Sequence, residues 1–139
     1  MKDRLDKATV GKLGEDVACK YLTKHGYKVI ERNYWKKWGE IDVIAIKDNA
    51  YHFVEVKSVT RSLSPKPASS GSGDNQAVPD YLAEENVHPW KLKRLSRAIQ
   101  TYCLERNLPD DQAWQLDVIT VELDFDTRNA QVKYLPDIG

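Results

Sequence analysis

The sequence predicts an α/β domain in which a mixed central sheet is flanked by helices. Two segments, residues 10–25 and 89–106, carry apolar residues at helical spacing. Between them lie two β-branched, apolar runs joined by a short polar turn, a pattern typical of a β-hairpin. Further apolar runs follow the second helix, so the predicted order is α-β-β-β-α-β with an extra C-terminal edge strand. We expect residues 1–139 to form one domain, since a chain of this length can enclose a single core.

The first helix is expected to run from Val10 to His25. Thr9 is a suitable N-cap, and Gly26 is a suitable stop signal after the last turn. Glu15 lies at the margin of the apolar face, where its carboxylate is able to reach a site between helix and sheet. The alternative is that Glu15 is an ordinary solvated acid. The apolar face itself comprises Val10, Gly14, Val17, Ala18, Tyr21 and Leu22.

The first strand is expected over residues 27–33, and the hairpin over residues 41–46 and 53–59. If the turn centres on Asp48-Asn49, the numbers of directly opposite residues add up to 97. Strict alternation would place Ile41, Val43 and Ala45 on one face, and Ile44 and Ile46 on the other. Apolar residues on both faces indicate a central strand that is covered on both sides.

The second half of the chain begins with a Ser/Gly/Pro-rich insertion at about residues 61–86, which we expect to be mobile. Pro89 suits the first position of the second helix, because its missing N–H is not needed there. Strands are then predicted over residues 114–121 and 130–135. The core face of this helix is expected to comprise Leu92, Leu95, Ile99, Tyr102 and Cys103.

The hairpin brings acidic and basic side chains together. In the predicted register Asp42 lies opposite Glu55, with Cβ atoms ~5 Å apart. Lys57, two residues after Glu55, points to the same face. Two carboxylates so close repel each other and resist burial unless a cation joins them. The pattern therefore predicts a divalent metal with oxygen ligands, for which Mg²⁺ or Mn²⁺ is most suitable.

The spacing Asp42-x12-Glu55-x-Lys57 on a hairpin resembles the PD-(D/E)xK nuclease superfamily, which includes type II restriction enzymes and archaeal Holliday-junction resolvases. Within it, the chain is similar to the small bacterial YraN-like family over about residues 9–60 and 87–122. The similar motifs are Gly11-Lys12-Leu13-Gly14-Glu15, Gly39-Glu40-Ile41-Asp42, Phe53-Val54-Glu55-Val56-Lys57 and Leu116-Asp117-Val118-Ile119. The resemblance implies a restriction-endonuclease-like core and metal-dependent hydrolysis of DNA phosphodiester bonds, and the kinship with resolvases makes branched or irregular DNA a candidate substrate.

The resemblance also implies roles for individual residues. Asp42, Glu55 and the Val56 carbonyl would hold Mg²⁺ or Mn²⁺, which activates water and the scissile phosphate. Lys57 would position that water or stabilise charge on the phosphate. Glu15 would bind the metal through water or help to orient the nucleophile. The alternative is a nucleic-acid-binding module that keeps the fold without cleaving, although the intact acid-acid-lysine set favours cleavage.

DNA is the expected partner, although the net charge is zero, because the charges are unevenly distributed. Residues 1–37 carry ten Lys/Arg against five Asp/Glu, and residues 87–106 carry five against one. Lys91 matches a lysine of the YraN-like pattern and is the expected phosphate contact. Arg94 and Arg97 lie on the outer face of the same helix and are further candidates. The alternative is that these cations only solvate helix faces.

Other features exclude competing classes of site. The chain has no apolar run near the ~20 residues of a membrane span, and its charged first residues do not resemble a signal peptide. Two cysteines are too few for a disulfide framework, so we expect a cytoplasmic protein. The three histidines are scattered, and His52 faces away from Glu55. Asp117 either orients Lys57 or is an edge charge that meets solvent. A homodimer is left open.

Overall fold

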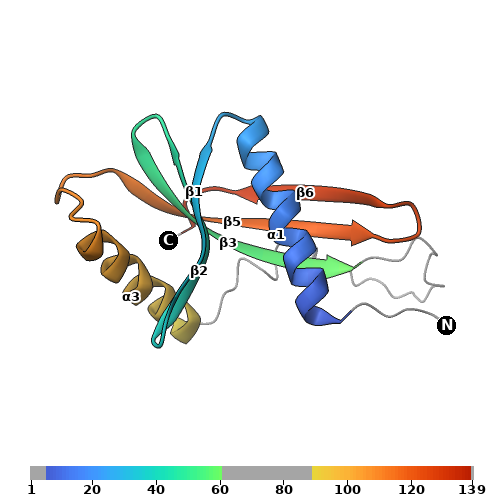
Figure 1. Ribbon diagram of the computed structural model, residues 1–139, viewed down its shortest axis with the longest axis horizontal. Coiled ribbons are helices and arrows are strands. Elements are labelled where there is room, and N and C mark those ends of the chain that lie inside the picture. Colours follow the sequence, from blue (N-terminus) through green and yellow to red (C-terminus); the bar gives the residue numbers. More distant parts are fainter. Residues whose placement is uncertain (1–5, 61–88, 139) are drawn as a thin grey trace.

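The computed structural model describes residues 6–60 and 89–138, so the insertion predicted at residues 61–86 lies outside the described residues. The five described strands form one sheet in the order β1-β2-β3-β5-β6 (Figure 1). β3 and β5 are parallel, and every other neighbouring pair is antiparallel. The elements are α1 (Lys7–Lys24), β1 (Lys28–Lys36), β2 (Gly39–Lys47), β3 (Ala50–Thr60), α3 (Pro89–Glu105), β5 (Trp114–Asp124) and β6 (Asn129–Leu135). The predicted α/β class and restriction-endonuclease-like order of elements are confirmed.

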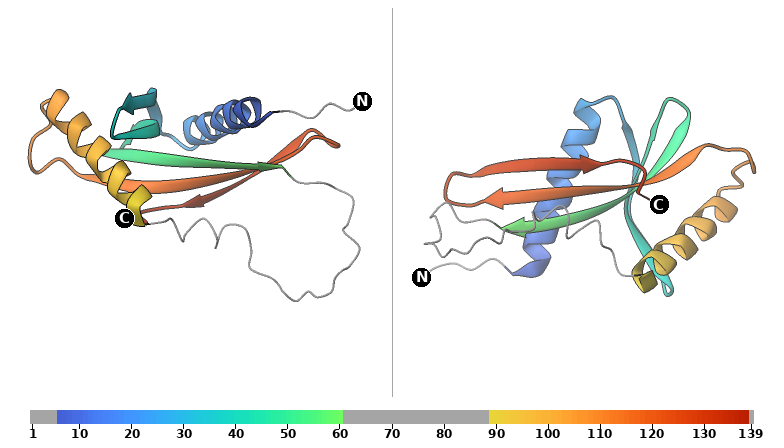
Figure 2. Two further views of the ribbon diagram at one scale, coloured as in Figure 1. Left: turned by 90° about the horizontal axis from the view of Figure 1, so that it is seen from below. Right: turned by 180° about the vertical axis from the view of Figure 1, so that it is seen from behind.

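The two helices lie on opposite faces of the sheet, as the left view of Figure 2 shows. Ala18 and Leu22 of α1 pack on a cluster that includes Val43 and Val54. On the other face, α3 packs on a second cluster. Its buried members are Tyr34, Ile41, Ile44, Phe53, Leu95, Ala98, Ile99, Tyr102 and Leu116. The central strands are therefore covered on both sides, as their apolar sequences predict. Within the described ranges, neither helix is long and apolar enough to cross a membrane.

The N-terminus of α1 differs from the prediction. Asp6 is the N-cap, and its Oδ1 accepts a hydrogen bond of 2.8 Å from the Thr9 backbone N–H. Thr9 therefore donates to the N-cap side chain and is not the N-cap itself. The helix begins at Lys7, three residues before the predicted start at Val10. Its C-terminus is as predicted, because Gly26 adopts a φ of +90° immediately after the cap residue His25. Gly14, Ala18 and Leu22 are the buried residues of its apolar face.

The predicted register of the β2–β3 hairpin is confirmed. The ladder runs from Lys47 opposite Ala50 to Val43 opposite Val54, so each pair of residue numbers adds up to 97. Both turn residues adopt the left-handed conformation, with φ of 51° at Asp48 and 65° at Asn49. This geometry matches the right-handed twist of the strands, and Asp and Asn tolerate it better than most residues.

The prediction that Ile41 shares a face with Val43 was wrong. Ile41 packs in the α3 cluster together with Ile44, whereas Val43 packs in the α1 cluster. The alternation is therefore broken at Asp42. On the neighbouring strand, Arg32 pairs with Val43 and Tyr34 pairs with Ile41, and Asn33 between them has a φ of 54°, so β1 is also distorted at this level. The distortion lies where β2 has passed the end of its ladder with β3.

Candidate functional site

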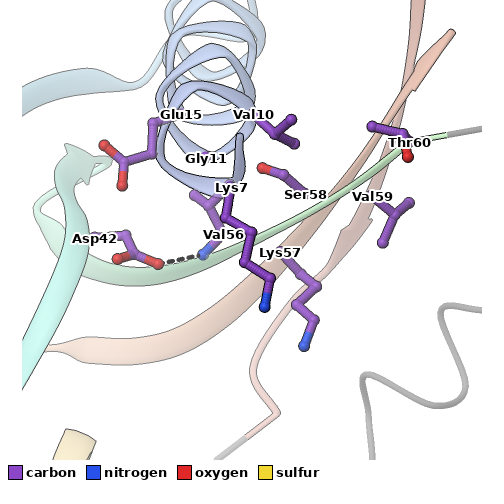
Figure 3. Close-up of a pocket in the computed structure, with 10 residues that line it drawn as sticks. All are labelled: Lys7, Val10, Gly11, Glu15, Asp42, Val56, Lys57, Ser58, Val59 and Thr60. Atoms are coloured by element: carbon purple, nitrogen blue, oxygen red, sulfur yellow. Dashed lines mark hydrogen bonds between the residues drawn. The ribbon is translucent and has the colours of Figure 1, made fainter. Parts of the chain in front are cut away.

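The site begins where β2 separates from β3. Asp42 lies one residue beyond the last ladder pair, Val43 and Val54. Its Oδ2 accepts a hydrogen bond of 2.8 Å from the Val56 backbone N–H, drawn as a dashed line in Figure 3. The side chain thus provides an acceptor for a β3 N–H group at the point where the two strands diverge. This bond fixes the Asp42 carboxylate beside the Glu55-Val56-Lys57 segment.

The environment of Asp42 is unfavourable for a negative charge. Burial, followed by the nearby Glu55 carboxylate, raises the pKa of Asp42 to about 7, although the Val56 N–H acts in the opposite direction. The more distant charges of Glu15 and Glu40 raise it further. The hairpin register predicts two close carboxylates. Besides burial, the raised pKa of Asp42 reflects the repulsion between its negative charge and that of Glu55. A bound cation would relieve it.

A cavity of about 630 Å³ lies between the N-terminal half of α1 and the end of β3. It brings together four predicted site residues: Glu15, Asp42, Val56 and Lys57. Figure 3 shows the Glu15 and Asp42 carboxylates on the same side of this cavity. The other residues that line it are Lys7, Val10, Gly11, Ser58, Val59 and Thr60.

Glu15 is placed by the close approach of α1 to β3. A Cβ atom on Gly14 would overlap the Ser58 side chain, so only glycine allows the two backbones this proximity. Glu15 also binds Arg32 of β1, with 3.3 Å between the guanidinium Nη2 and the carboxylate Oε1. Arg32 contacts Asp16 as well, at 3.0 Å. Sequence reasoning missed Arg32, because no spacing rule relates it to the helix acids.

Glu55 is the predicted metal ligand that does not line this cavity. It is buried, and its Oε2 lies 2.6 Å from the Nζ of Lys91 on α3. Burial lowers the pKa of Lys91, but the hydrogen bond and charge of Glu55 outweigh that effect, so the pKa is raised. The predicted phosphate contact is therefore an ion-pair partner of a predicted metal ligand. Sequence analysis placed the two residues in different roles and missed their contact.

The donor set suits a hard divalent cation that retains water. Asp42 and Glu55 supply two carboxylates whose repulsion a cation would relieve, and the Val56 carbonyl is an additional oxygen. Within residues 6–60 and 89–138, no group of three or more His, Cys, Asp or Glu side chains is arranged to hold a metal ion. Mg²⁺ is commonly bound by one or two carboxylates together with water and substrate phosphate, so this limited set fits it.

Arg94 and Arg97 are exposed on the outer face of α3, as predicted, and neither lines the cavity. Lys91 is the residue of this basic helix that reaches the acidic pair. The three cations thus follow α3 away from the site, at intervals of three residues.

Asp117 fits neither of the roles considered for it. It is fully buried, and it lies on β5 three positions before Thr120, the residue that pairs with Lys57. Its carboxylate accepts hydrogen bonds from Tyr134 Oη at 2.8 Å, Gln115 Nε2 at 2.8 Å and the Asp137 backbone N–H at 2.8 Å. It also contacts His52 Nδ1 at 2.7 Å. The hydrogen bonds of Asp117 therefore link β6, through Tyr134, and the following residue Asp137 to β5.

Comparisons with known proteins place the site residues inside a shared region. A family model described as "Uncharacterised protein family UPF0102" matches residues 14–121, which contain every predicted site residue. A UPF0102 protein of Campylobacter jejuni is 35% identical over 114 residues, covering 82% of this chain and 84% of the relative. One of Helicobacter hepaticus is 35% identical over 112 residues, covering 81% and 83%. One of Caldanaerobacter subterraneus is 35% identical over 120 residues, covering 86% and 84%.

Proposed function

The chain belongs to the UPF0102 family, and we propose that it is a Mg²⁺- or Mn²⁺-dependent endonuclease that hydrolyses phosphodiester bonds in DNA. The observation that carries the proposal is the partly buried Asp42 carboxylate, which the Val56 N–H holds beside the buried Glu55 and whose pKa is raised to about 7 by burial and by Glu55. A folded protein gains no stability from two carboxylates held together in this way. Such a pair is expected where a cation is bound for function.

The proposal assigns a role to each group at the site. Asp42, Glu55 and the Val56 carbonyl would hold the cation, which when bound supplies Lewis-acid activation of water and of the phosphodiester. Lys57 contributes a positive charge at the edge of the cavity and would stabilise the charge that develops on the scissile phosphate. Glu15, held by Arg32, would orient the attacking water.

The basic face of α3 would hold the DNA backbone next to this centre. Lys91 is close enough to contact Glu55, so a phosphate bound by Lys91 would lie beside the acidic pair. Arg94 and Arg97 extend the positive charge along the helix. Electrostatic contacts of this kind supply affinity without sequence preference.

A second candidate is a nucleic-acid-binding module that retains the fold and does not cleave. The ion pair between Lys91 and Glu55 favours this candidate, because an ammonium group already neutralises one of the two carboxylates. The first candidate is better supported by Asp42, whose charge is not neutralised by the hydrogen bond from Val56.

One experiment separates the two candidates. Linear, nicked, single-stranded and four-way-junction DNA are each incubated with the protein in Mg²⁺, in Mn²⁺ and in EDTA. The nuclease proposal expects cleavage of at least one form that EDTA abolishes and that the Asp42→Asn protein lacks. Binding without cleavage under every condition would support the module. Equal cleavage by wild type and Asp42→Asn would place the activity outside this site.

A further inference from the structure

The turn between β1 and β2 packs against the side of α3 that carries Ala98 and Thr101. The turn has two central residues, Lys37 and Trp38, since Lys36 pairs with Gly39. A Cβ atom on Gly39 would overlap the carbonyl oxygen of Arg94, so the hairpin backbone lies directly against the helix. The Trp38 indole N–H donates a hydrogen bond of 3.0 Å to the Thr101 hydroxyl oxygen. These contacts hold the tip of the hairpin in one position.

The Trp38 ring is fixed and accessible at the same time. Its side chain is anchored through the indole nitrogen, yet the residue is 41% exposed. Thr101 in turn donates a hydrogen bond of 2.9 Å to the Arg97 carbonyl oxygen, so the indole lies next to the helical turn that carries Arg97. A large aromatic ring that is oriented in this way loses little conformational freedom when a flat ligand stacks on it.

Exposed cations lie on both elements that position Trp38, the β1–β2 turn and α3. Lys37 is exposed beside it in the turn, and Arg94 and Arg97 are exposed on α3. Glu105 is the single acid of α3, and its Oε2 is 2.7 Å from the Lys36 ammonium. An exposed aromatic ring among cations is the combination that binds single-stranded nucleic acid, because bases stack on the ring while the cations contact phosphates.

We infer that Trp38, Arg94 and Arg97 form a binding surface for unpaired nucleotides that flank the scissile bond. In a duplex the faces of the bases are stacked on one another, so a fixed indole has no base face to contact. An unpaired base exposes its face and can stack on Trp38. The inference rests on the proposed function for the position of the scissile bond. Gly39 and Asp42 are three steps apart along β2, which corresponds to ~10 Å of extended chain.

Trp35 provides a matched control on the same hairpin. It is 64% exposed, more than Trp38. Its neighbour Tyr34 packs edge-on against Tyr102 of α3, with 5.3 Å between the ring centroids. Since successive side chains of a strand point to opposite faces, Trp35 points away from α3 and from Arg94 and Arg97. It is an exposed tryptophan without the basic helix beside it.

The test measures binding in EDTA, so that no cleavage takes place. Fluorescence anisotropy compares a labelled single-stranded oligonucleotide with its duplex for wild type, Trp38→Leu, Trp38→Phe and Trp35→Leu. We expect Trp38→Leu to weaken single-strand binding about ten-fold and duplex binding less than two-fold, roughly the effect of losing one stacked base. Trp38→Phe should retain most of the affinity, since it keeps an aromatic face. Trp35→Leu should bind like wild type.

Three outcomes would overturn the inference. Trp38→Leu could weaken both DNA forms equally, or Trp35→Leu could have the same effect as Trp38→Leu. Wild type could also bind neither form, which would refute a nucleic-acid-binding role for this surface. EDTA prevents cleavage during the binding measurement. The inference about Trp38 and the proposed cleavage can therefore be refuted independently of each other. A protein that cuts DNA without a Trp38 effect refutes this inference, and one that shows the effect without cutting refutes the proposed cleavage.

Discussion

The ammonium group of Lys91 lies 2.6 Å from Oε2 of Glu55, so a positive charge of α3 contacts one member of the acidic pair. The two residues belong to α3 and β3, on the face of the sheet opposite α1. The Lys91 ammonium therefore supplies part of the positive charge that a metal ion would place beside Glu55. A divalent cation bound by Glu55 would compete with Lys91 for this carboxylate, and a displaced Lys91 would be available to a phosphate.

Lys91→Gln is expected to increase the affinity for Mn²⁺ in the absence of DNA. Glu55 would lose its competing partner, and a half-exposed ion pair is worth about 1 kcal/mol, which corresponds to roughly five-fold in affinity. Isothermal titration calorimetry provides the measurement. Lys93→Gln is the matched control, because Lys93 is exposed on the same helix and should leave the affinity unchanged. Weaker Mn²⁺ binding by Lys91→Gln would show that Lys91 does not compete with the metal.

Asp42→Asn is expected to stabilise the metal-free protein at alkaline pH. The folded-state pKa of Asp42 is about 7 and its usual value is 3.8, so between these values the folded state binds more protons than the unfolded state. The free energy of unfolding of wild type therefore falls as pH rises through this window. Asparagine carries no charge and can still accept the hydrogen bond from Val56.

The measurement is urea unfolding of both proteins in EDTA across the pH range. The difference between them should be near zero at about pH 4 and reach ~2 kcal/mol in favour of Asp42→Asn at about pH 8. With saturating Mn²⁺ the order should reverse, because the metal stabilises only the protein that binds it. A constant difference at every pH would mean that Asp42 has the same pKa in both states.

Lys57→Ala is expected to abolish cleavage while changing DNA affinity little. Lys57 is next to the metal-binding segment, and a lost charge-stabilising group typically lowers kcat by about 10²–10³-fold. Other cations contribute the attraction for the DNA backbone. Single-turnover cleavage and anisotropy in EDTA measure the two effects separately. Lys7→Ala, which removes another lysine of the cavity, should reduce cleavage less. Equal losses for both variants would indicate a general effect of charge.

Local sequence signals predicted the fold well because each acts over a few residues. The Asp48-Asn49 turn sets the hairpin register, but the ladder ends at Val43 opposite Val54, one residue short of the predicted pair of Asp42 and Glu55. The hydrogen bond from the Val56 N–H then holds Asp42 beside the Glu55 segment. The N-cap was predicted at Thr9 and lies at Asp6. Both residue types are suitable N-caps, and the two residues are donor and acceptor of the same capping hydrogen bond. Strict alternation failed at Ile41, where the strand leaves its partner and the period of two no longer applies.

The contacts of the site residues could not be predicted, because they join elements that are far apart in the sequence. Lys91 reaches Glu55 across 36 positions, and Tyr134 reaches Asp117 from a different strand. The pattern identified which residues carry charge. It did not indicate which of them neutralise one another, since that depends on how α3 and β6 pack on the sheet.

The position of Glu15 depends on Gly14, which leads to a prediction with an internal control. Gly14→Ala places a methyl group within the Ser58 side chain, so α1 must move away from β3. Overpacking of this kind costs typically 1–3 kcal/mol, and a shift of Glu15 should lower kcat as well. Gly11→Ala, one turn earlier in the same helix, meets no atom within 4 Å.

Gly11→Ala should therefore raise the free energy of unfolding by about 0.5–1 kcal/mol, since alanine favours the helix over glycine. Thermal unfolding and single-turnover cleavage should be measured for both variants and for Gly14→Ala combined with Ser58→Gly. The double variant removes the atoms that clash and should recover much of the lost stability and rate. If it recovers neither while Gly11→Ala behaves as expected, the close contact between Gly14 and Ser58 is not what positions Glu15.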